Sequence, residues 1–378
     1  MEAGQRNNRK DGKLHMKRLL CIVSAMNAGG AETFLMKIYR NLDRTKYQMD
    51  FCVNSSTNLY EKEIMDLGGR IYVVPPKSKS LIGWYKGTKK IVQENQYHYA
   101  LRVCEHSLAA LDLIVAKQGG ADHLIMRSSN ASSGSKASVI LHKMFKFLAI
   151  SIPTVKIAPS TEAAEYTFGK GCVSRGDALI LHNALDTDVF HFDSEGRKRI
   201  REELNLEDKY VVGHVGRFNK QKNHEFLIDI FSELLKKKPE SRLVLVGAGE
   251  LEEQIRQKVS SLNLEPFVFF TGVRKDVPQL MSAFDVFLFP SLYEGMPNTV
   301  IEAQATGLSC VVSDTITREA NITGLVNYVS LDNVEDWIYG IENTKITTDR
   351  LNIKRIVYEQ KYDIVSQVEV FTKYVFAD

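Results

Sequence analysis

Two series of apolar runs, interleaved with stretches of helical length, most constrain what this chain can fold into. Seven runs come first, and six more follow a polar interruption. Continuous apolar strands separated by helices are typical of parallel sheets that are covered on both faces. We therefore predict an α/β protein with two doubly wound domains. Its strands are expected at 18–24, 48–53, 70–74, 100–104, 123–126, 154–158 and 177–181, and then at 210–215, 242–246, 267–271, 286–289, 309–312 and 325–329.

The length of 378 residues agrees with two domains, because single hydrophobic cores stop growing near roughly 250–300 residues. We expect an N-terminal Rossmann-like domain at 16–182, a linker at 183–208 and a C-terminal Rossmann-like domain at 209–350. Helices over 351–378 are expected to cross back to the first domain, and polar residues 1–15 to form a disordered extension. Since ligands of such sheets lie at the carboxyl ends of strands, the two domains are expected to face a central cleft.

Charge is unevenly distributed along the chain. Residues 1–185 hold 26 basic and 15 acidic side chains, whereas residues 186–378 hold 23 and 31. A basic first half favours an anionic partner, either a membrane surface or a phosphorylated substrate, rather than a nucleic acid. The five cysteines are scattered without C-x-x-C spacing, and no apolar run reaches the roughly 20 residues of a membrane span. We therefore expect a cytoplasmic protein, peripheral to a membrane at most.

Two glycine-rich turns follow predicted strands, at 27–32 and 245–250. Glycines allow close approach of a ligand to the backbone, and the following helix N-terminus favours an anion such as a phosphate. Gly30 is the candidate residue in the first turn. The alternative is that both are ordinary strand-to-helix turns, because neither the Rossmann spacing nor the P-loop signature is present.

A basic loop at 216–223 closes the first strand of the second series. It places Arg217 and Lys222 at a strand end, where a ligand of a doubly wound sheet lies. A guanidinium and an ammonium together suit a diphosphate, and their charge replaces that of a metal. The alternative is a solvated basic loop.

The segment 294–302 has the most specific pattern, with two glutamates on either side of a G-x-P turn. Pro297 suits the first turn of a helix, and Gly295 leaves room for a ligand. Glu302 is then expected on the helix and Glu294 in the loop before it. One carboxylate would meet a sugar and the other a ribose diol. The alternative is a surface helix with two ordinary glutamates.

Together these segments resemble the retaining glycosyltransferases of family 4, known as group 1, which have the GT-B fold. The resemblance spans about residues 17–375, and its nearest branch serves bacterial capsule and exopolysaccharide biosynthesis. It rests on the glycine-rich first loop, the Glu-x7-Glu segment with the EAQATGLSCVVSD that follows it, and the strings APSTEAAEYTFG (158–169), NALDTDVF (183–190), VGRFNKQKN, LVGAGE and FTGVRKDV (270–277).

The resemblance implies a role for each matching residue. Arg217 and Lys222 would hold the diphosphate of a nucleotide-sugar donor, Glu302 the ribose hydroxyls, and Glu294 the transferred sugar near its reacting face. The donor site would also include Gly30, Gly295, Met296, Pro297, Thr299, Val273 and Arg274. UDP is the expected nucleotide and GDP the alternative. The acceptor would be a glycan or a lipid-linked glycan, and no cofactor is expected.

One departure from the family pattern concerns the sugar side of the site. Where the branch commonly has His-Ser-His-Asn, this chain has Arg127, Ser128, Ser129 and Asn130. A histidine thought to contact outer sugar hydroxyls is therefore replaced by Ser129, and His106 is the candidate substitute. Two rival functions stay open: a nucleotide-sugar epimerase or hydrolase on the same fold, and a catalytically silent binding subunit. The departure favours only the second of these.

Two further features bear on partners. Asp186 and Asp188 imitate a D-x-D metal signature, but they lie in the linker without other oxygen ligands, so no metal site is predicted. Basic side chains surround aromatic residues in two stretches, 77–90 and 136–147, and both stretches are candidates for docking on an anionic membrane surface. These candidates include Lys77, Trp84 and His142. The alternative is that each is a solvated helix face over a core.

Overall fold

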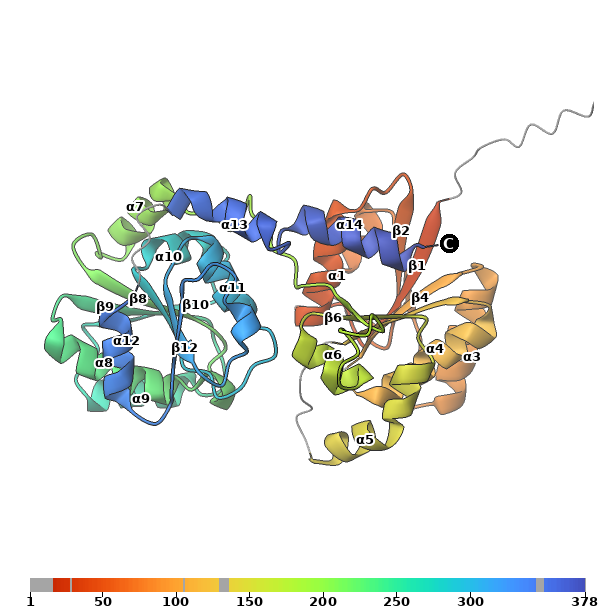
Figure 1. Ribbon diagram of the computed structural model, residues 1–378, viewed down its shortest axis with the longest axis horizontal. Coiled ribbons are helices and arrows are strands. Elements are labelled where there is room, and N and C mark those ends of the chain that lie inside the picture. The colour runs from red at the N-terminus through yellow and green to blue at the C-terminus, as the bar shows by residue number, and fades with distance from the viewer. Residues whose placement is uncertain (1–15, 28, 105, 129–135, 345–349, 378) are drawn as a thin grey trace, which may run out of the picture. The chain divides into compact units, whose positions relative to one another are not determined.

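The computed structural model describes residues 16–27, 29–104, 106–128, 136–344 and 350–377. It contains two parallel β-sheets flanked by helices (Figure 1). The first sheet has the order β3-β2-β1-β4-β5-β6-β7. Its strands are β1 (Lys17–Ile22), β2 (Tyr47–Val53), β3 (Ile71–Val73), β4 (Tyr99–Cys104), β5 (His123–Ser128), β6 (Val155–Ala158) and β7 (Leu179–Ile180).

The second sheet has six strands in the order β10-β9-β8-β11-β12-β13. They are β8 (Tyr210–Val215), β9 (Ser241–Val246), β10 (Val268–Gly272), β11 (Val286–Phe289), β12 (Cys310–Ser313) and β13 (Val326–Val329). Each predicted apolar run overlaps one of these thirteen strands, so the predicted fold class of two doubly wound α/β domains is confirmed.

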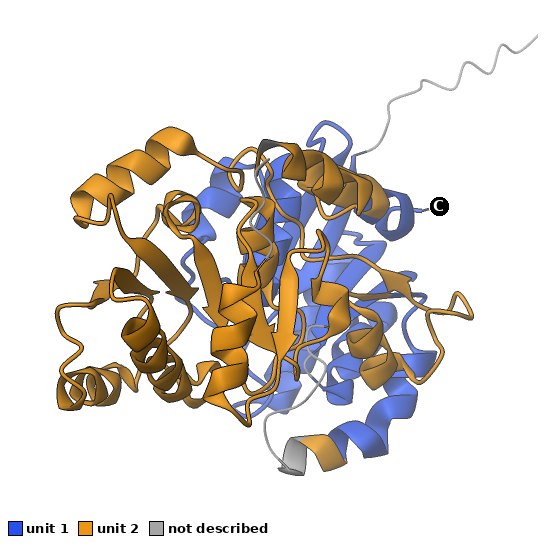
Figure 2. Ribbon diagram, turned by 60° about the vertical axis from the view of Figure 1, so that its left-hand side comes forward, with its two compact units in different colours: residues 1–127, 141–156, 371–378 blue, residues 128–140, 157–370 orange. Residues whose placement is uncertain are grey.

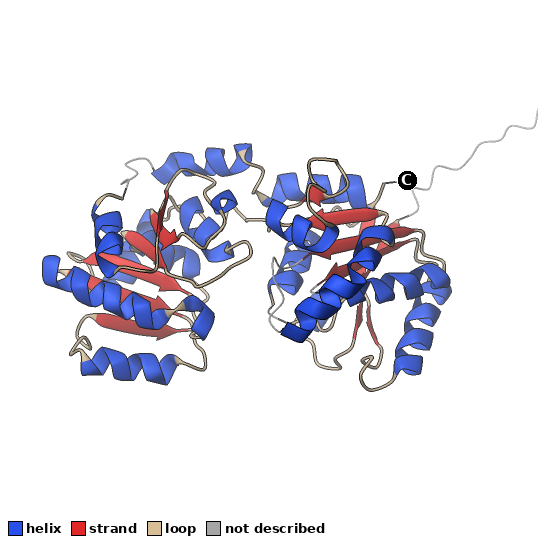
Figure 3. Cartoon of the chain, turned by 60° about the horizontal axis from the view of Figure 1, so that its bottom comes forward, coloured by secondary structure: helices blue, strands red, loops and turns tan. Residues whose placement is uncertain are grey.

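Helices lie on both sides of the strands in each sheet (Figure 3). The α-helices are α1 (Gly30–Asn41), α2 (Glu61–Asp66), α3 (Leu81–Glu94), α4 (Ala110–Gly119), α5 (Lys136–Ser151), α6 (Thr161–Phe168), α7 (Ser194–Glu203), α8 (His224–Lys237), α9 (Glu252–Ser261), α10 (Val277–Ala283), α11 (Asn298–Ala305), α12 (Val334–Glu342), α13 (Ile353–Glu359) and α14 (Ile364–Val375). Among the described helices, none combines the length and the apolar character needed to cross a bilayer.

Strand β11 illustrates why the strands are continuous apolar runs. Phe287 and Phe289 join one buried cluster, together with Phe284. Val286 and Leu288 join the cluster on the other face, which contains Trp337 from α12. Because successive side chains of a strand point to opposite faces, a strand covered on both faces is apolar at every position.

The chain divides into two compact units (Figure 2). Unit 1 contains the described residues of 1–127, 141–156 and 371–378, and unit 2 contains those of 128–140 and 157–370. Within unit 1, Lys17 Nζ donates a hydrogen bond of 2.8 Å to the carbonyl of Phe376, so the end of the chain is tied to β1. The domain boundaries expected from the sequence stay a prediction, and the extension expected at 1–15 lies outside the described residues.

The stretch 183–208, expected to be a linker, contains the ten-residue helix α7. Asp193 caps this helix, since its carboxylate accepts a hydrogen bond of 2.8 Å from the N–H of Gly196. Ile200 is fully buried in the core, and Arg201 is also buried. The strongly polar composition of α7 did not indicate a helix, but the Asp193 N-cap and the buried side chain of Ile200 stabilise one.

Two aromatic residues expected on the basic surface are buried instead. Trp84 is 7% exposed and donates a hydrogen bond of 2.8 Å from Nε1 to Asp112, which also pairs with Lys77 at 2.9 Å. His142 is 2% exposed and is hydrogen-bonded to the hydroxyl of Ser107 at 3.0 Å. These side chains therefore belong to the interior of unit 1.

Candidate active site

The predicted donor-binding residues of unit 2 gather on one edge of the six-stranded sheet. Strands β9, β8 and β11 are neighbours and parallel, so the loops that follow them lie at the same edge. Arg217 and Lys222 follow β8, and Glu294 follows β11. This edge holds the carboxyl ends of the strands, where doubly wound sheets bind ligands.

Lys222 and Glu294 form an ion pair that links two of these loops. Lys222 Nζ lies 2.7 Å from Glu294 Oε1, and the two side chains are only 16% and 10% exposed. The loops are also joined by two hydrogen bonds of 2.9 Å, from the N–H of Leu292 to the carbonyl of Gln221 and from Gln221 Nε2 to the carbonyl of Tyr293. These hydrogen bonds fix the loop that carries Lys222 to the loop that carries Glu294.

Buried aromatic rings lie beneath the loop that follows β8. Lys222 Nζ is 4.4 Å from the ring centroid of Phe289, and His224 stacks on Phe218 at 4.2 Å. Burial, with a smaller contribution from the Lys222 charge, lowers the pKa of His224 to about 4. Burial, followed by the charge that His224 would carry, also holds the pKa of His214 well below its usual range. Both imidazoles are therefore neutral at pH 7.

Arg217 pairs with a different carboxylate. Its guanidinium lies 3.0 Å from Glu250 Oε2, and the two side chains are 69% and 55% exposed. The N–H of Glu250 itself, more than the Arg217 charge, lowers the pKa of this carboxyl. Sequence reasoning named Glu294 as a sugar contact but missed both pairings, although Glu250 ends the LVGAGE string and lies in the turn that packs against 216–218.

Gly247 and Gly249 in that turn are explained by loop packing. A Cβ on Gly247 would lie 2.1 Å from the carbonyl oxygen of Gly216, and Gly247 has φ +138°. A Cβ on Gly249 would lie 2.4 Å from the carbonyl oxygen of Phe218. Both positions need glycine because two backbones touch there, so ligand binding by this turn stays a prediction without support from these glycines.

Helix α11 carries the second glutamate. Pro297 is its N-cap with φ −79°, one position before the predicted first turn. Thr299 and Glu302 are half-buried on the helix, as the pattern predicts. Asn183 Nδ2 donates a hydrogen bond of 2.8 Å to Asn298 Oδ1, which ties the 183–190 motif to the helix start. The loop before the helix contains two more predicted residues, Gly295 and Met296.

The loop after β10 contains Val273 and Arg274. The Arg274 guanidinium lies 2.7 Å from Asp276 and 2.8 Å from Glu203. Hydrogen bonds to these carboxylates, that to Asp276 first, raise its pKa. The side chain is therefore committed to these two carboxylates, and the place of Arg274 in the donor site stays a prediction. The side chain of Val273 is exposed.

Two of the remaining candidates, Gly30 and His106, lie in unit 1. Gly30 begins α1, and a Cβ placed on it meets no described atom within 4 Å, so packing within the described residues does not require a glycine there. His106 precedes the 3₁₀ helix η1 (Ser107–Ala109), and its Nδ1 is buried without a hydrogen-bond partner in the described part of the chain. Ser129 and Asn130 lie outside the described residues.

The D-x-D string of the 183–190 motif has a structural role. Asp186 Oδ1 accepts a hydrogen bond of 2.9 Å from the N–H of Asp188 and so stabilises a turn. The Asp188 carboxylate pairs with Lys354. Across the residues that the structure describes, no group of three or more His, Cys, Asp or Glu side chains is arranged to hold a metal ion.

Comparison with known proteins gives the family. A family model described as glycosyl transferases group 1 matches residues 209–344. EpsF of Bacillus subtilis, whose name assigns it provisionally to the glycosyltransferases, is 32% identical over 322 residues, which cover 83% of this chain and 84% of EpsF. An Escherichia coli UDP-Gal:α-D-GlcNAc-diphosphoundecaprenol α-1,3-galactosyltransferase is 28% identical over 244 residues, 62% of each chain.

Solved structures give the fold. The Anabaena protein Alr3699/HepE, solved in complex with UDP, superposes with a TM-score of 0.78 at 19% identity, over 96% of this chain and all of that one. The glycosyltransferase WaaG superposes with a TM-score of 0.69 over 96% of this chain and all of WaaG, at 14% identity. The chain therefore belongs to the group 1 glycosyltransferases and is a nucleotide-sugar-dependent glycosyltransferase of the GT-B fold.

Proposed function

We propose that this enzyme transfers a sugar from a UDP-sugar to a growing, lipid-linked glycan during cell-surface polysaccharide biosynthesis, with retention and without a metal. The observation that carries this proposal is the placement of Arg217, Lys222 and Glu294 on one sheet edge. Two cations and a nearly buried carboxylate at the carboxyl ends of parallel strands suit a donor with a charged diphosphate and a neutral sugar.

The proposed chemistry breaks the bond between the anomeric carbon and a diphosphate oxygen and forms a bond from that carbon to an acceptor hydroxyl. Lys222 and Arg217 stabilise the negative charge that develops on the leaving diphosphate. That diphosphate takes the acceptor proton, so no separate base is required. Glu294 contacts the sugar, and Glu302 holds the ribose hydroxyls.

The relatives support the donor and acceptor classes. HepE is solved with UDP-glucose, and the Escherichia coli relative is named for transfer from UDP-Gal to a diphosphoundecaprenol-linked sugar. EpsF supports the glycosyltransferase class through its resemblance over most of the chain. His106, Ser129 and Asn130 are the proposed contacts on the sugar and acceptor side.

The test is donor turnover across UDP-, GDP- and ADP-sugars in EDTA, with and without a lipid extract as acceptor. Turnover of one UDP-sugar that rises with the extract and gives a retained linkage supports the proposal. Turnover that the extract leaves unchanged favours an epimerase or hydrolase. Tight nucleotide binding without turnover of any donor would show a silent binding subunit.

Helix α5 supports docking on an anionic membrane surface. Four apolar side chains of unit 1 are exposed on it: Leu141, Met144, Phe147 and Ile150. Met144 and Phe147 are neighbours on the helix surface, Leu141 and Ile150 lie at the two borders of the same apolar stripe, and Lys143 is exposed between them. An exposed apolar stripe with adjacent cations is typical of helices that lie in a membrane interface.

Sedimentation with vesicles tests this docking. The Met144→Ser/Phe147→Ser variant is expected to lose most of its binding to phosphatidylglycerol vesicles while keeping its turnover of soluble donor. Tyr339→Ser, which removes an equally exposed ring from α12, is the matched control and should bind as the unaltered protein does. Equal sedimentation of all three proteins, or of the unaltered protein with neutral vesicles, would contradict docking.

A further inference from the structure

A basic cavity lies at the opposite edge of the six-stranded sheet from the candidate active site. Its lining includes Tyr210 at the start of β8, Asp285 just before β11 and Ser309 just before β12. These are the amino ends of the strands, whereas the donor loops follow their carboxyl ends. A strand of six residues is about 20 Å long. The cavity and the donor loops are therefore separated by about the length of one strand.

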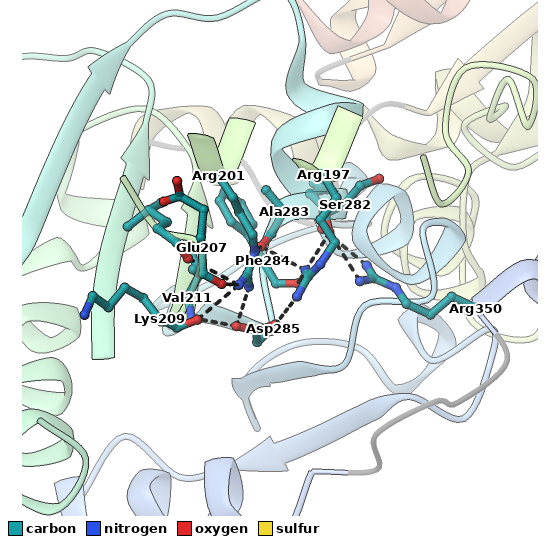
Figure 4. Close-up of polar contacts among 12 residues, drawn as sticks. Arg197, Arg201, Glu207, Lys209, Val211, Ser282, Ala283, Phe284, Asp285 and Arg350 are labelled. Carbon is teal, nitrogen blue, oxygen red and sulfur yellow. Dashed lines mark hydrogen bonds and ion pairs between the residues drawn. The ribbon is translucent and has the colours of Figure 1, made fainter. Parts of the chain in front are cut away.

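Three arginines converge on this cavity, from α7 and from the 3₁₀ helix η4 (Arg350–Asn352) (Figure 4). Arg197 and Arg201 each approach one oxygen of Asp285, at 2.7 Å and 2.6 Å. Arg350 approaches from another side and donates to main-chain carbonyls, that of Thr306 at 2.8 Å and that of Ser282 at 3.3 Å. Among the described carboxylates, none forms an ion pair with Arg350.

Positive charge exceeds negative charge around the cavity. Its lining contains five cationic side chains, the three arginines with Lys209 and Lys238, and three carboxylates, Asp208, Glu240 and Asp285. Asp208 and Glu240 are exposed, so water screens them, while Asp285 is shared by two guanidiniums. Burial, followed by repulsion from Arg197, lowers the pKa of Arg350 to about 10, as expected for a cation without a full counter-charge.

Helix capping explains only part of this arrangement. The arginines bond to the last carbonyls of α10 and α11, where cations are favoured by the helix dipole. Capping does not require an open cavity of about 620 Å³ or the lysines that line it. Lys238 lies 3.6 Å from the ring centroid of Tyr210, and Arg350 lies 4.3 Å from that of Phe192, so aromatic rings hold these cations near the cavity.

We propose that this cavity, the arginine pocket, is a second binding site for a small soluble phosphorylated anion, separate from the donor site. Guanidinium and ammonium groups match phosphate oxygens, and an excess of two positive charges suits a dianion better than a monovalent ion. The volume admits a diphosphate or a sugar phosphate. The proposal rests on the pocket alone and does not depend on which donor or acceptor the enzyme uses.

Calorimetric titration with inorganic diphosphate, at constant ionic strength and with excess UDP present, tests the pocket. Binding is expected to weaken at least 10-fold in Lys209→Ala/Lys238→Ala. Lys236→Ala/Lys237→Ala, which removes two exposed lysines of α8 that do not line the cavity, is the matched control and should bind normally. Arg217→Ala/Lys222→Ala, on the donor loops, should also keep this binding.

Other outcomes overturn the proposal. Diphosphate binding that survives the Lys209/Lys238 substitutions but is lost with Arg217→Ala/Lys222→Ala belongs to the donor loops, and no binding at millimolar diphosphate leaves no site. Arg350→Gln is a second pocket variant, with circular dichroism as a check on folding because Arg350 also caps helices. Loss of vesicle binding in the lysine variant, without any diphosphate binding, would instead assign the pocket to a lipid headgroup.

Discussion

The two ion pairs of the loop after β8 differ sharply in environment. Lys222 and Glu294 are 16% and 10% exposed, whereas Arg217 and Glu250 are 69% and 55% exposed. An exposed pair contributes about 0–1 kcal/mol because water and salt screen it, while removing one partner of a buried pair leaves a costly unpaired charge. We therefore expect the first pair to support both structure and catalysis, and the second to contribute mainly to binding.

The largest expected effect is that of Glu294→Gln on transfer. The amide keeps the shape of the side chain but removes its charge, and loss of one such group typically costs about 10²–10³ in rate. Donor binding, measured by calorimetry with UDP, should change only a few-fold. Equal losses in UDP binding and in turnover would show that Glu294 acts on the nucleotide rather than the sugar.

Lys222→Met should lower the free energy of unfolding by about 2 kcal/mol, because Glu294 is left nearly buried and unpaired. It should also slow transfer. The double variant with Glu294→Gln is expected to regain most of the stability but none of the activity. Additive effects on stability in this cycle, measured by denaturant unfolding, would show that the pair is not coupled.

The buried histidine under the loop makes stability depend on pH. The pKa of His224 is lowered to about 4 in the folded protein, whereas it is near 6.5 in the unfolded chain. The stability that neutral His224 contributes is therefore fully present above pH 6.5. It is lost as the pH falls toward 4, because the unfolded chain binds the proton first. At pH 5 this loss amounts to about 2 kcal/mol. His224→Phe should remove that part of the pH dependence, whereas His191→Asn, at an exposed histidine, should not.

The smallest effect is expected for Arg217→Ala. Its exposed pair should contribute almost nothing measurable to stability, while loss of one phosphate contact should weaken donor binding roughly 10-fold. Thermal unfolding and UDP titration measure the two effects. A loss of stability as large as that of Lys222→Met would erase the distinction between the two pairs.

Much of the fold was predictable from the sequence, because strands covered on both faces are apolar at every position. Strands β8 and β11 match the predicted runs residue for residue. Helix α7 was missed because ten mostly charged residues hide one core anchor, Ile200. From its composition alone, the segment was predicted to be part of a linker.

The residues of the site could be predicted from the sequence, but the ion pairs that they form could not. Arg217, Lys222 and Glu294 were identified as residues of one donor site, and the structure places all three on one sheet edge. That Lys222 pairs with Glu294 depends on β11 lying beside β8. No local pattern encodes this neighbourhood, since the pair is 72 positions apart in the chain. The family resemblance identifies Lys222 and Glu294 as site residues, but only the order of the strands in the sheet brings the two side chains together.

The crossover that brings β8 and β11 together also has a consequence for folding. The residues between Lys222 and Glu294 include β9, β10 and the helices that pack on them, and the pair closes a loop around all of these elements. Contacts of such high sequence separation form late, because chain entropy must be lost first. On the ribosome, Lys222 emerges well before Glu294 and the strands β12 and β13 emerge after it, so the ion pair reports the docking of β11 beside β8 before the sheet is complete.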